Sequence, residues 1–198
     1  MLFIFDMGGV VTKPDEMPDF FNWLNLTPQE FFTLCTGGSS NIWNAFESGK
    51  LSIDGFWSAF NQRSRDMRKD IPEVHGDIYR QYFHPELNAG TVAVIEVLKK
   101  KHRVVCGTNT NASHYAIHEE RGDYALFHET YASNKMGVVK PFTAFFEHIL
   151  KAEGVRAEDA FFTDDSAENC AAASSLGIHA VRFTDADSLF QEWEQWMK

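Results

Sequence analysis

The sequence has few cysteines and no long apolar run, and each shortage excludes a class of protein. Its 198 residues include three cysteines, Cys35, Cys106 and Cys170. Three scattered thiols are too few for a disulfide framework or a paired-cysteine zinc site, so we interpret them as small buried side chains. No segment has the apolar length that a bilayer span requires, which predicts that the protein has no membrane partner.

Basic residues are also scarce. Lys and Arg total 18 against 28 Asp and Glu, so the formal net charge is −10. A chain this acidic is repelled by nucleic-acid backbones and anionic lipid surfaces, and we expect no nucleic-acid partner. The N-terminal residues lack the basic leader and the cleavage site of a signal peptide, which predicts a cytoplasmic protein. The overall charge still permits a local cationic pocket for a small anion.

Apolar residues are plentiful, at 44% with 18 phenylalanines, and their spacing differs between two parts of the chain. Over residues 15–85 they recur at helical spacing without a strand run. Thr27, Pro28 and Glu30 form a good helix start, with a capping hydroxyl, a proline at the first helical position and an acid at the third. Ser52 opens another helix. This part predicts a bundle of three or four helices.

Strands alternate with helices in the rest of the chain. A short apolar strand over residues 2–5 ends at Asp6 and is followed by Gly8 and Gly9. After residue 85 we expect helices over residues 88–101, 113–121, 141–153, 168–176 and 187–197, and strands over residues 103–108, 129–133, 160–163 and 178–182. This alternation predicts a parallel sheet with helices on both faces.

The fold class is therefore α/β: a Rossmann-like parallel sheet flanked by helices, with an inserted all-helical cap subdomain. We expect residues 1–14 and 86–198 to form the core and residues 15–85 to form the cap. His114 and His118 lie one helical turn apart on a polar helix. Because no acidic zinc-site pattern accompanies them, we expect exposed histidines.

Polar residues follow the predicted strands at their carboxyl ends, where an open parallel sheet binds ligands. These residues are Asp6, Thr108, Asn109, Asp164 and Asp165, with Lys140 at the start of a helix near the same edge. Three carboxylates at one edge repel one another unless a cation joins them, and Mg²⁺ suits such oxygen ligands.

The other polar groups at this edge suit a phosphate. A lysine and a threonine hydroxyl bind phosphoryl oxygens, and backbone N–H groups at Gly8 and Gly9 add to the cradle. A carboxylate beside a metal-bound phosphate can attack phosphorus and form an aspartyl-phosphate. The pattern therefore predicts phosphoryl transfer with Mg²⁺ as cofactor.

Four segments resemble, in order, the motifs of the haloacid dehalogenase-like (HAD) hydrolase superfamily, in the branch with a helical cap after the first strand. They are FIFDMGGVV at residues 3–11, VVCGTN at residues 104–109, GVVKP at residues 137–141 and FFTDDSAEN at residues 161–169. The resemblance spans nearly the whole chain.

This resemblance implies a role for each site residue. Asp6 is the nucleophile and a metal ligand, and the Gly8 carbonyl reaches the metal. Thr108 and Lys140 bind the phosphate, and Asn109, whose loop faces the substrate, is a candidate substrate contact. Asp165 is a direct Mg²⁺ ligand, and Asp164 binds the ion directly or through water.

One position departs from the phosphatases of the superfamily. They usually carry a second aspartate two residues after the nucleophile, which protonates the leaving group and then activates water; here Gly8 stands there. Loss of a positioned acid and base costs roughly 10²–10⁴ in rate. Three explanations stay open: a substrate such as an acyl or anomeric sugar phosphate, whose leaving group needs little protonation; a substitute among Asp15, Glu16 and Glu47; or vestigial activity. Alpha-D-glucose-1-phosphatase-like enzymes also have glycine there, which favours an active enzyme.

We therefore predict a Mg²⁺-dependent phosphatase, monomeric or homodimeric, that hydrolyses a small phosphorylated metabolite such as a sugar phosphate. The main alternative is a phosphate-binding pseudoenzyme or regulatory module, impaired by Gly8. A phosphotransferase is a further alternative. A 2-haloacid dehalogenase is disfavoured, because those enzymes carry tyrosine at the Gly8 position and lack an acidic pair like Asp164 and Asp165.

Overall fold

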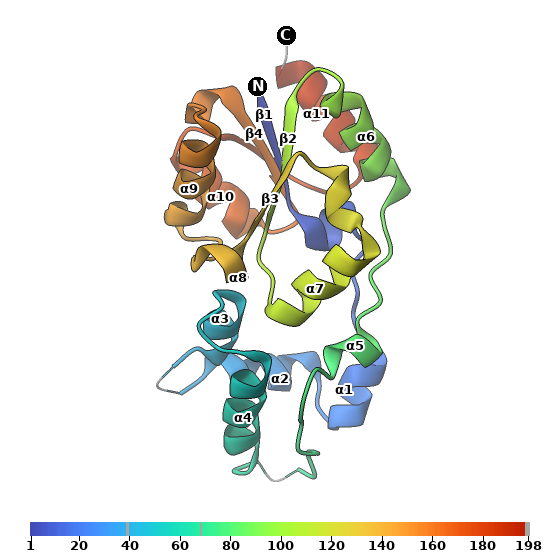
Figure 1. Ribbon diagram of the computed structural model, residues 1–198, viewed down its shortest axis with the longest axis vertical. Helices are drawn as coiled ribbons and strands as arrows, with labels where there is room; N and C mark the ends of the chain where they lie inside the picture. The colour runs from blue at the N-terminus through green and yellow to red at the C-terminus, as the bar shows by residue number, and fades with distance from the viewer. Residues whose placement is uncertain (39, 68, 197–198) are drawn as a thin grey trace.

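Five parallel strands form one sheet in the upper part of the molecule (Figure 1). The computed structural model describes residues 1–38, 40–67 and 69–196. The spatial order is β3-β2-β1-β4-β5, and every neighbouring pair is parallel. The strands are β1 (Leu2–Phe5), β2 (Arg103–Thr108), β3 (Glu129–Ala132), β4 (Ala160–Asp164) and β5 (His179–Arg182). The predicted α/β fold class with a Rossmann-like sheet is confirmed.

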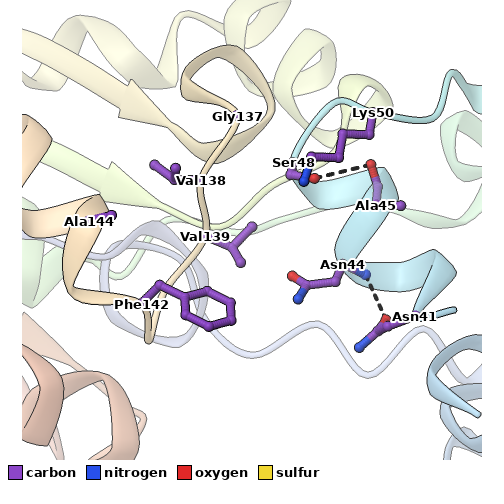
Figure 2. A pocket seen from close by; sticks show the side chains of 10 residues that line it. All are labelled: Asn41, Asn44, Ala45, Ser48, Lys50, Gly137, Val138, Val139, Phe142 and Ala144. Carbon is purple, nitrogen blue, oxygen red and sulfur yellow. Dashed lines mark hydrogen bonds between the residues drawn. The ribbon is translucent and has the colours of Figure 1, made fainter.

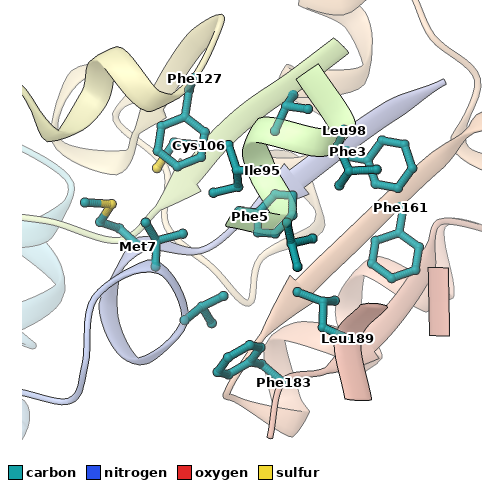
Figure 3. Packing of buried hydrophobic residues seen from close by; sticks show 14 residues of the cluster. Phe3, Phe5, Met7, Ile95, Leu98, Cys106, Phe127, Phe161, Phe183 and Leu189 are labelled. Atoms are coloured by element: carbon teal, nitrogen blue, oxygen red, sulfur yellow. The ribbon is translucent and has the colours of Figure 1, made fainter. Parts of the chain in front are cut away.

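Alternate residues of β1 face two separate layers of helices. Phe3 and Phe5 pack into an apolar cluster on one face of the sheet (Figure 3). Leu2 and Ile4 pack into a second cluster on the other face. The covering helices are α6 (Ala89–Lys99) and α11 (Ala186–Trp196) on the first face, and α9 (Thr143–Glu153) and α10 (Ala167–Ser175) on the second. All four β1 side chains are fully buried, as the central strand of a covered parallel sheet requires.

A separate helical block lies beyond the carboxyl ends of the strands (Figure 1). It consists of α1 (Pro18–Leu24), α2 (Pro28–Thr36), α3 (Ile42–Glu47), α4 (Ile53–Ser64) and the short α5 (Tyr79–Tyr82). Thr27 and Glu30 cap α2 reciprocally, and Ser52 caps α4, so both predicted helix starts are confirmed. The block has its own aromatic core, in which the rings of Phe46 and Phe56 stack with centroids 4.3 Å apart.

Two linkers that run side by side join this block to the sheet. Thr12 and Leu87 form an antiparallel bridge, and the backbone N–H of Lys13 donates to the carbonyl of Glu86 at 2.8 Å. The polypeptide therefore leaves the sheet and returns to it at one place. This arrangement accords with the predicted boundaries between core and cap at residues 14 and 86, which stay a prediction. The last residue of the predicted core, Lys198, lies outside the described residues.

Some predicted element ends differ from the structure. Helix α9 begins at Thr143 rather than residue 141, because the backbone of Phe142 is extended and its N–H donates back to Val139 in a turn. The last helix was predicted to reach Met197, which lies outside the described residues. The remaining elements are α7 (Ala112–Arg121), α8 (Ser133–Met136), the 3-10 turns Asp123–Leu126 and Ala157–Asp159, and the π-type turn Met7–Val11. Among the described residues, no helix has the length and apolar character of a membrane span.

Candidate active site

The side chain of Lys140 lies at the centre of an acidic cluster at the carboxyl edge of the sheet. Its Nζ is 2.8 Å from Oδ1 of Asp6 and 2.6 Å from Oδ2 of Asp164, and it donates to the Gly107 carbonyl at 3.0 Å. Lys140 is only 3% exposed. Burial alone lowers the pKa of Lys140, but Asp6 and Asp164 outweigh burial and hold that pKa above its usual value. The ammonium group therefore stays charged.

Asp6 follows the last residue of β1 and is held by the backbone. Its N–H donates to the Thr163 carbonyl at 3.0 Å, and its Oδ1 accepts the N–H of Met7 at 2.8 Å. Burial raises the pKa of Asp6 to about 7; Lys140 opposes that rise and Asp164 adds to it. The residue predicted as nucleophile thus has a fixed position beside the buried cation.

Asn109 holds the backbone on which Lys140 stands. Its side-chain amide donates to the Lys140 carbonyl at 2.9 Å, and its side-chain oxygen accepts the Lys140 N–H at 2.8 Å. The nitrogen and the oxygen of the Asn109 carboxamide are therefore both hydrogen-bonded to the loop that carries Lys140. A direct substrate contact by Asn109 stays a prediction, whereas its contact with Lys140 was not foreseen from sequence.

Asp164 and Asp165 differ in environment although they are neighbours. Asp164 is fully buried and accepts from the N–H of Ser166 at 2.8 Å and from the side-chain amide of Asn169 at 3.0 Å. Asp165 is exposed, and burial, followed by the charge of Asp164, raises its pKa. Ser166 caps α10, which leaves both carboxylates at the sheet edge.

The acidic residues fit a divalent cation. Carboxylate oxygens of Asp6, Asp164 and Asp165 lie within 4.8 Å of one another. Three oxygen donors of this kind at one point suit Mg²⁺, which takes few protein ligands and keeps several waters. These three carboxylates belong to the predicted donor set, which stays a prediction.

A cavity of about 310 Å³ opens beside the carboxylate of Asp165. Gly8, Gly9, Thr108, Asn109 and Asp165 are among the residues that line it. No atom lies within 4 Å of the point where a Cβ on Gly8 would stand. The position at which related phosphatases carry their acid is therefore open space in this protein.

The candidates for a substitute acid lie in different surroundings. Asp15 accepts the N–H groups of Met17 and His84, so its carboxylate ties the two linkers together. Glu16 is exposed. Glu47 is partly buried at the end of α3, where the charges of Lys140 and Asp6 act on the pKa of its carboxyl group.

The prediction that His114 and His118 are exposed is wrong. His118 is 4% exposed and its Nδ1 lies 2.8 Å from Oδ2 of Asp123. The ring of His114 stacks on Phe83 with centroids 3.9 Å apart, and burial lowers the pKa of His114 to about 3. The helical block covers this side of α7 through α5, a long-range contact that the polar sequence of α7 does not reveal.

A second cavity, of about 450 Å³, lies between the helical block and the core (Figure 2). Asn41, Asn44 and Ser48 line it from α3 and its flanks, and Val139 and Phe142 line it from the loop that carries Lys140. Residues of the two parts face each other across this space. The loop of Lys140 therefore contributes to the boundary between block and core.

Comparison with known proteins supplies the family. Residues 1–177 match the family model described as haloacid dehalogenase-like hydrolase. The chain belongs to the haloacid dehalogenase-like hydrolases. The resemblance inferred from the four motifs is thereby confirmed.

The individual relatives of this HAD-like hydrolase described below share only a low sequence identity with it. It is similar to the sesquiterpene phosphatase astK of Aspergillus oryzae, with 28% identity over 97% of this chain and 94% of that protein. It is equally similar, at 28% identity over 94% of this chain, to the drimenol cyclase drtB of Aspergillus calidoustus, but it spans about a third (34%) of that relative's length. Its fold is similar to that of a HAD family enzyme from Bacteroides thetaiotaomicron solved in complex with magnesium and inorganic phosphate. The TM-score is 0.71 and the identity 23%, over 93% of this chain and 94% of that one.

Proposed function

We propose that this hydrolase is a Mg²⁺-dependent phosphatase that acts on a small phosphorylated metabolite through an aspartyl-phosphate on Asp6. The placement of Lys140 between Asp6 and Asp164, with Asp165 alongside, is the observation that carries the proposal. It combines a fixed carboxylate, a buried cation and a donor set for a hard metal ion at one point. The astK relative, a phosphatase by name, supports the same chemistry.

Each residue has a defined role in this proposal. Asp6 attacks phosphorus, and Lys140 and Thr108 bind the phosphoryl oxygens. Asp6, the Gly8 carbonyl, Asp164 and Asp165 would hold Mg²⁺, which supplies positive charge that offsets the phosphate's negative charge. The N–H groups of Gly8 and Gly9 complete the phosphate cradle.

Two substrate classes are compatible with the cavity at the boundary between block and core. Asn41 and Asn44 offer amide groups that suit the hydroxyls of a sugar phosphate. Val138, Val139 and the exposed ring of Phe142 offer apolar contacts, which suit a terpenyl phosphate of the kind that the name of astK implies. A substrate panel must contain both classes.

The decisive experiment measures phosphate release from such a panel with and without Mg²⁺. Wild-type protein should release phosphate only with Mg²⁺, and Asp6→Asn should release none. Equal phosphate release by the wild type and by Asp6→Asn contradicts the proposal. The acidic pair at the sheet edge disfavours a dehalogenase, since a metal-free attack on carbon gives Asp164 and Asp165 no function.

The pseudoenzyme alternative rests on the open space at Gly8. It predicts that the wild type binds inorganic phosphate but releases none from substrates, whereas Gly8→Asp gains activity. A phosphotransferase would instead pass the phosphoryl group to an added alcohol faster than to water. Product analysis with an acceptor alcohol separates that outcome from hydrolysis.

A further inference from the structure

The reaction proposed above lacks a proton donor among the residues of the nucleophile loop. Gly8 has no side chain, and the space beside it is open. An alkoxide that leaves without a proton is a poor leaving group, and the lack of a positioned acid costs roughly 10²–10⁴ in rate. A carboxyl group from another element is therefore expected near the phosphate site.

Glu47 ends α3, and two contacts hold this end of the helix against the core. The Ser133 hydroxyl donates to the backbone carbonyl of Glu47 at 2.6 Å, and the same hydroxyl accepts the N–H of Thr110 at 2.9 Å. A Cβ on Gly49 would stand 2.3 Å from the carbonyl oxygen of Asn134, so the chain after α3 lies directly on α8. The helical block thus touches the core beside the loop of Thr108.

The charge of the Glu47 carboxyl group interacts with the charges of the acidic cluster. Burial raises the pKa of Glu47 to about 7, Lys140 and the side chain of Trp43 oppose that rise, and Asp6 adds to it. Among the described residues, no ion pair involves Glu47. Glu47 is therefore a partly buried carboxyl group on a helix end that docks beside the loop of Thr108, and its charge interacts with those of Lys140 and Asp6.

We infer that Glu47 is the general acid and base of this enzyme, supplied by the helical block in place of the side chain that Gly8 lacks. The inference rests on the proposed phosphatase function. It assigns the block a catalytic residue in addition to any part in substrate choice. Asp15 lines the 310 Å³ cavity, but both of its carboxylate oxygens accept backbone N–H groups of the linkers, and Glu16 is exposed, so both are less suited to this role.

The protons balance over the two steps of the reaction. An oxygen of Asp6 forms a bond to phosphorus, the bond from phosphorus to the ester oxygen breaks, and that oxygen takes the proton of the Glu47 carboxyl. Water then attacks phosphorus and passes a proton to the Glu47 carboxylate. The bond from phosphorus to Asp6 breaks, phosphate leaves, and both carboxyl groups return to their starting states.

Glu47→Gln tests this role, because it keeps the shape of the side chain and removes the proton. Two substrates are needed: an aryl phosphate, whose phenolate leaves without a proton, and an alkyl phosphate, whose alkoxide does not. In the first turnover, Glu47→Gln should release the phenol at close to the wild-type rate and the alcohol roughly 10²–10⁴-fold more slowly. The aspartyl-phosphate should then accumulate with the aryl substrate, because its hydrolysis needs the base.

Three further variants complete the experiment. Glu147→Gln, an exposed change on α9, should match the wild type on both substrates. Adding Gly8→Asp to Glu47→Gln should restore alcohol release, since the structure has room for that side chain. Glu47→Asp keeps the acid and should retain part of the alkyl activity, which separates lost chemistry from a packing defect.

The outcomes are distinguishable. If Glu47→Gln slows both leaving groups equally, or slows neither, Glu47 is not the acid and the phosphatase proposal still stands. If the wild type releases phosphate from neither ester nor from the metabolite panel, the proposed function fails and the role of Glu47 fails with it.

Discussion

The side chain of Asn109 forms two hydrogen bonds to the backbone of Lys140: its amide nitrogen donates to the carbonyl at 2.9 Å, and its oxygen accepts the N–H at 2.8 Å. The two residues are 31 positions apart and belong to different loops. This contact joins the loop after β2 to the loop before α9. It therefore fixes the position of Lys140 at the edge of the sheet.

We predict that Asn109→Ala lowers kcat/KM for phosphate esters about 10–100-fold, because the two lost bonds release the loop of Lys140. The free energy of unfolding should fall by about 1–3 kcal/mol, the usual cost of unpaired buried polar groups. Steady-state kinetics and urea unfolding measure the two effects. Asn22→Ala, on the exposed side of α1, serves as the control and should change neither.

Gly9→Ala should weaken Mg²⁺ binding. Gly9 has a φ of 74°, and a Cβ there would stand 2.6 Å from Oδ2 of Asp165, so the carboxylate must move. Gly122→Ala is a matched control, since Gly122 has a φ of 76° and no neighbouring atom within 4 Å. Both variants should lose about 1 kcal/mol of stability from backbone strain. Calorimetric titration with Mg²⁺ should show weaker binding only for Gly9→Ala, and equal affinity for the two variants contradicts the placement of Asp165 at the metal.

Lys140→Met should destabilise the fold by about 3–5 kcal/mol near neutral pH, because two buried carboxylates lose their shared cation. Added Mg²⁺ should restore part of this loss by taking over the positive charge. Urea unfolding with and without Mg²⁺ measures both effects. The control is Lys13→Met, which breaks a solvent-exposed pair with Glu86 and should leave the free energy of unfolding nearly unchanged.

Glu153 gives a pH-dependent contribution to stability. Its carboxylate accepts hydrogen bonds from Arg103 and Tyr131. The contact with Arg103 is the largest cause that holds the pKa of Glu153 below its usual value. A lowered folded-state pKa stabilises the protein above the unfolded-state value and ceases to do so as the pH falls through the folded-state value.

The variant Glu153→Gln should therefore be less stable than the wild type by about 1–2 kcal/mol at pH 7, after allowance for the half-exposed arginine. The two proteins should converge in strongly acidic solution. Urea unfolding across a pH series measures the difference. Glu158→Gln, whose pair with Arg156 is exposed, should show no such trend. A constant difference at all pH values contradicts the ionic origin of the effect.

The order of elements along the chain could be predicted from sequence because short-range patterns encode it. An apolar run that stops at Asp6, a capping box at Thr27 and the alternation of strands and helices after residue 85 each act within a few residues. Parallel strands present their carboxyl ends at one edge of a sheet, and this rule predicts from the sequence alone that Asp6, Thr108 and Asp164 lie at the same edge.

The surroundings of those residues could not be predicted in this way. The burial of His118 depends on the helical block lying over α7, and the polar residues around it indicate the opposite. The place of Glu47 depends on a hydrogen bond to Ser133, 86 positions away. No local pattern in the sequence reports either contact.

The amino-acid sequence alone specifies which elements form, in which order, and which chemical groups stand at the ends of the strands, because hydrophobic spacing and capping act over a few residues. The contact of Asn109 with Lys140, the open space at Gly8 and the docking of Glu47 beside the loop of Thr108 depend on tertiary packing. Those contacts join segments 31 and more residues apart, so their geometry follows from how the block and the loops pack over the sheet.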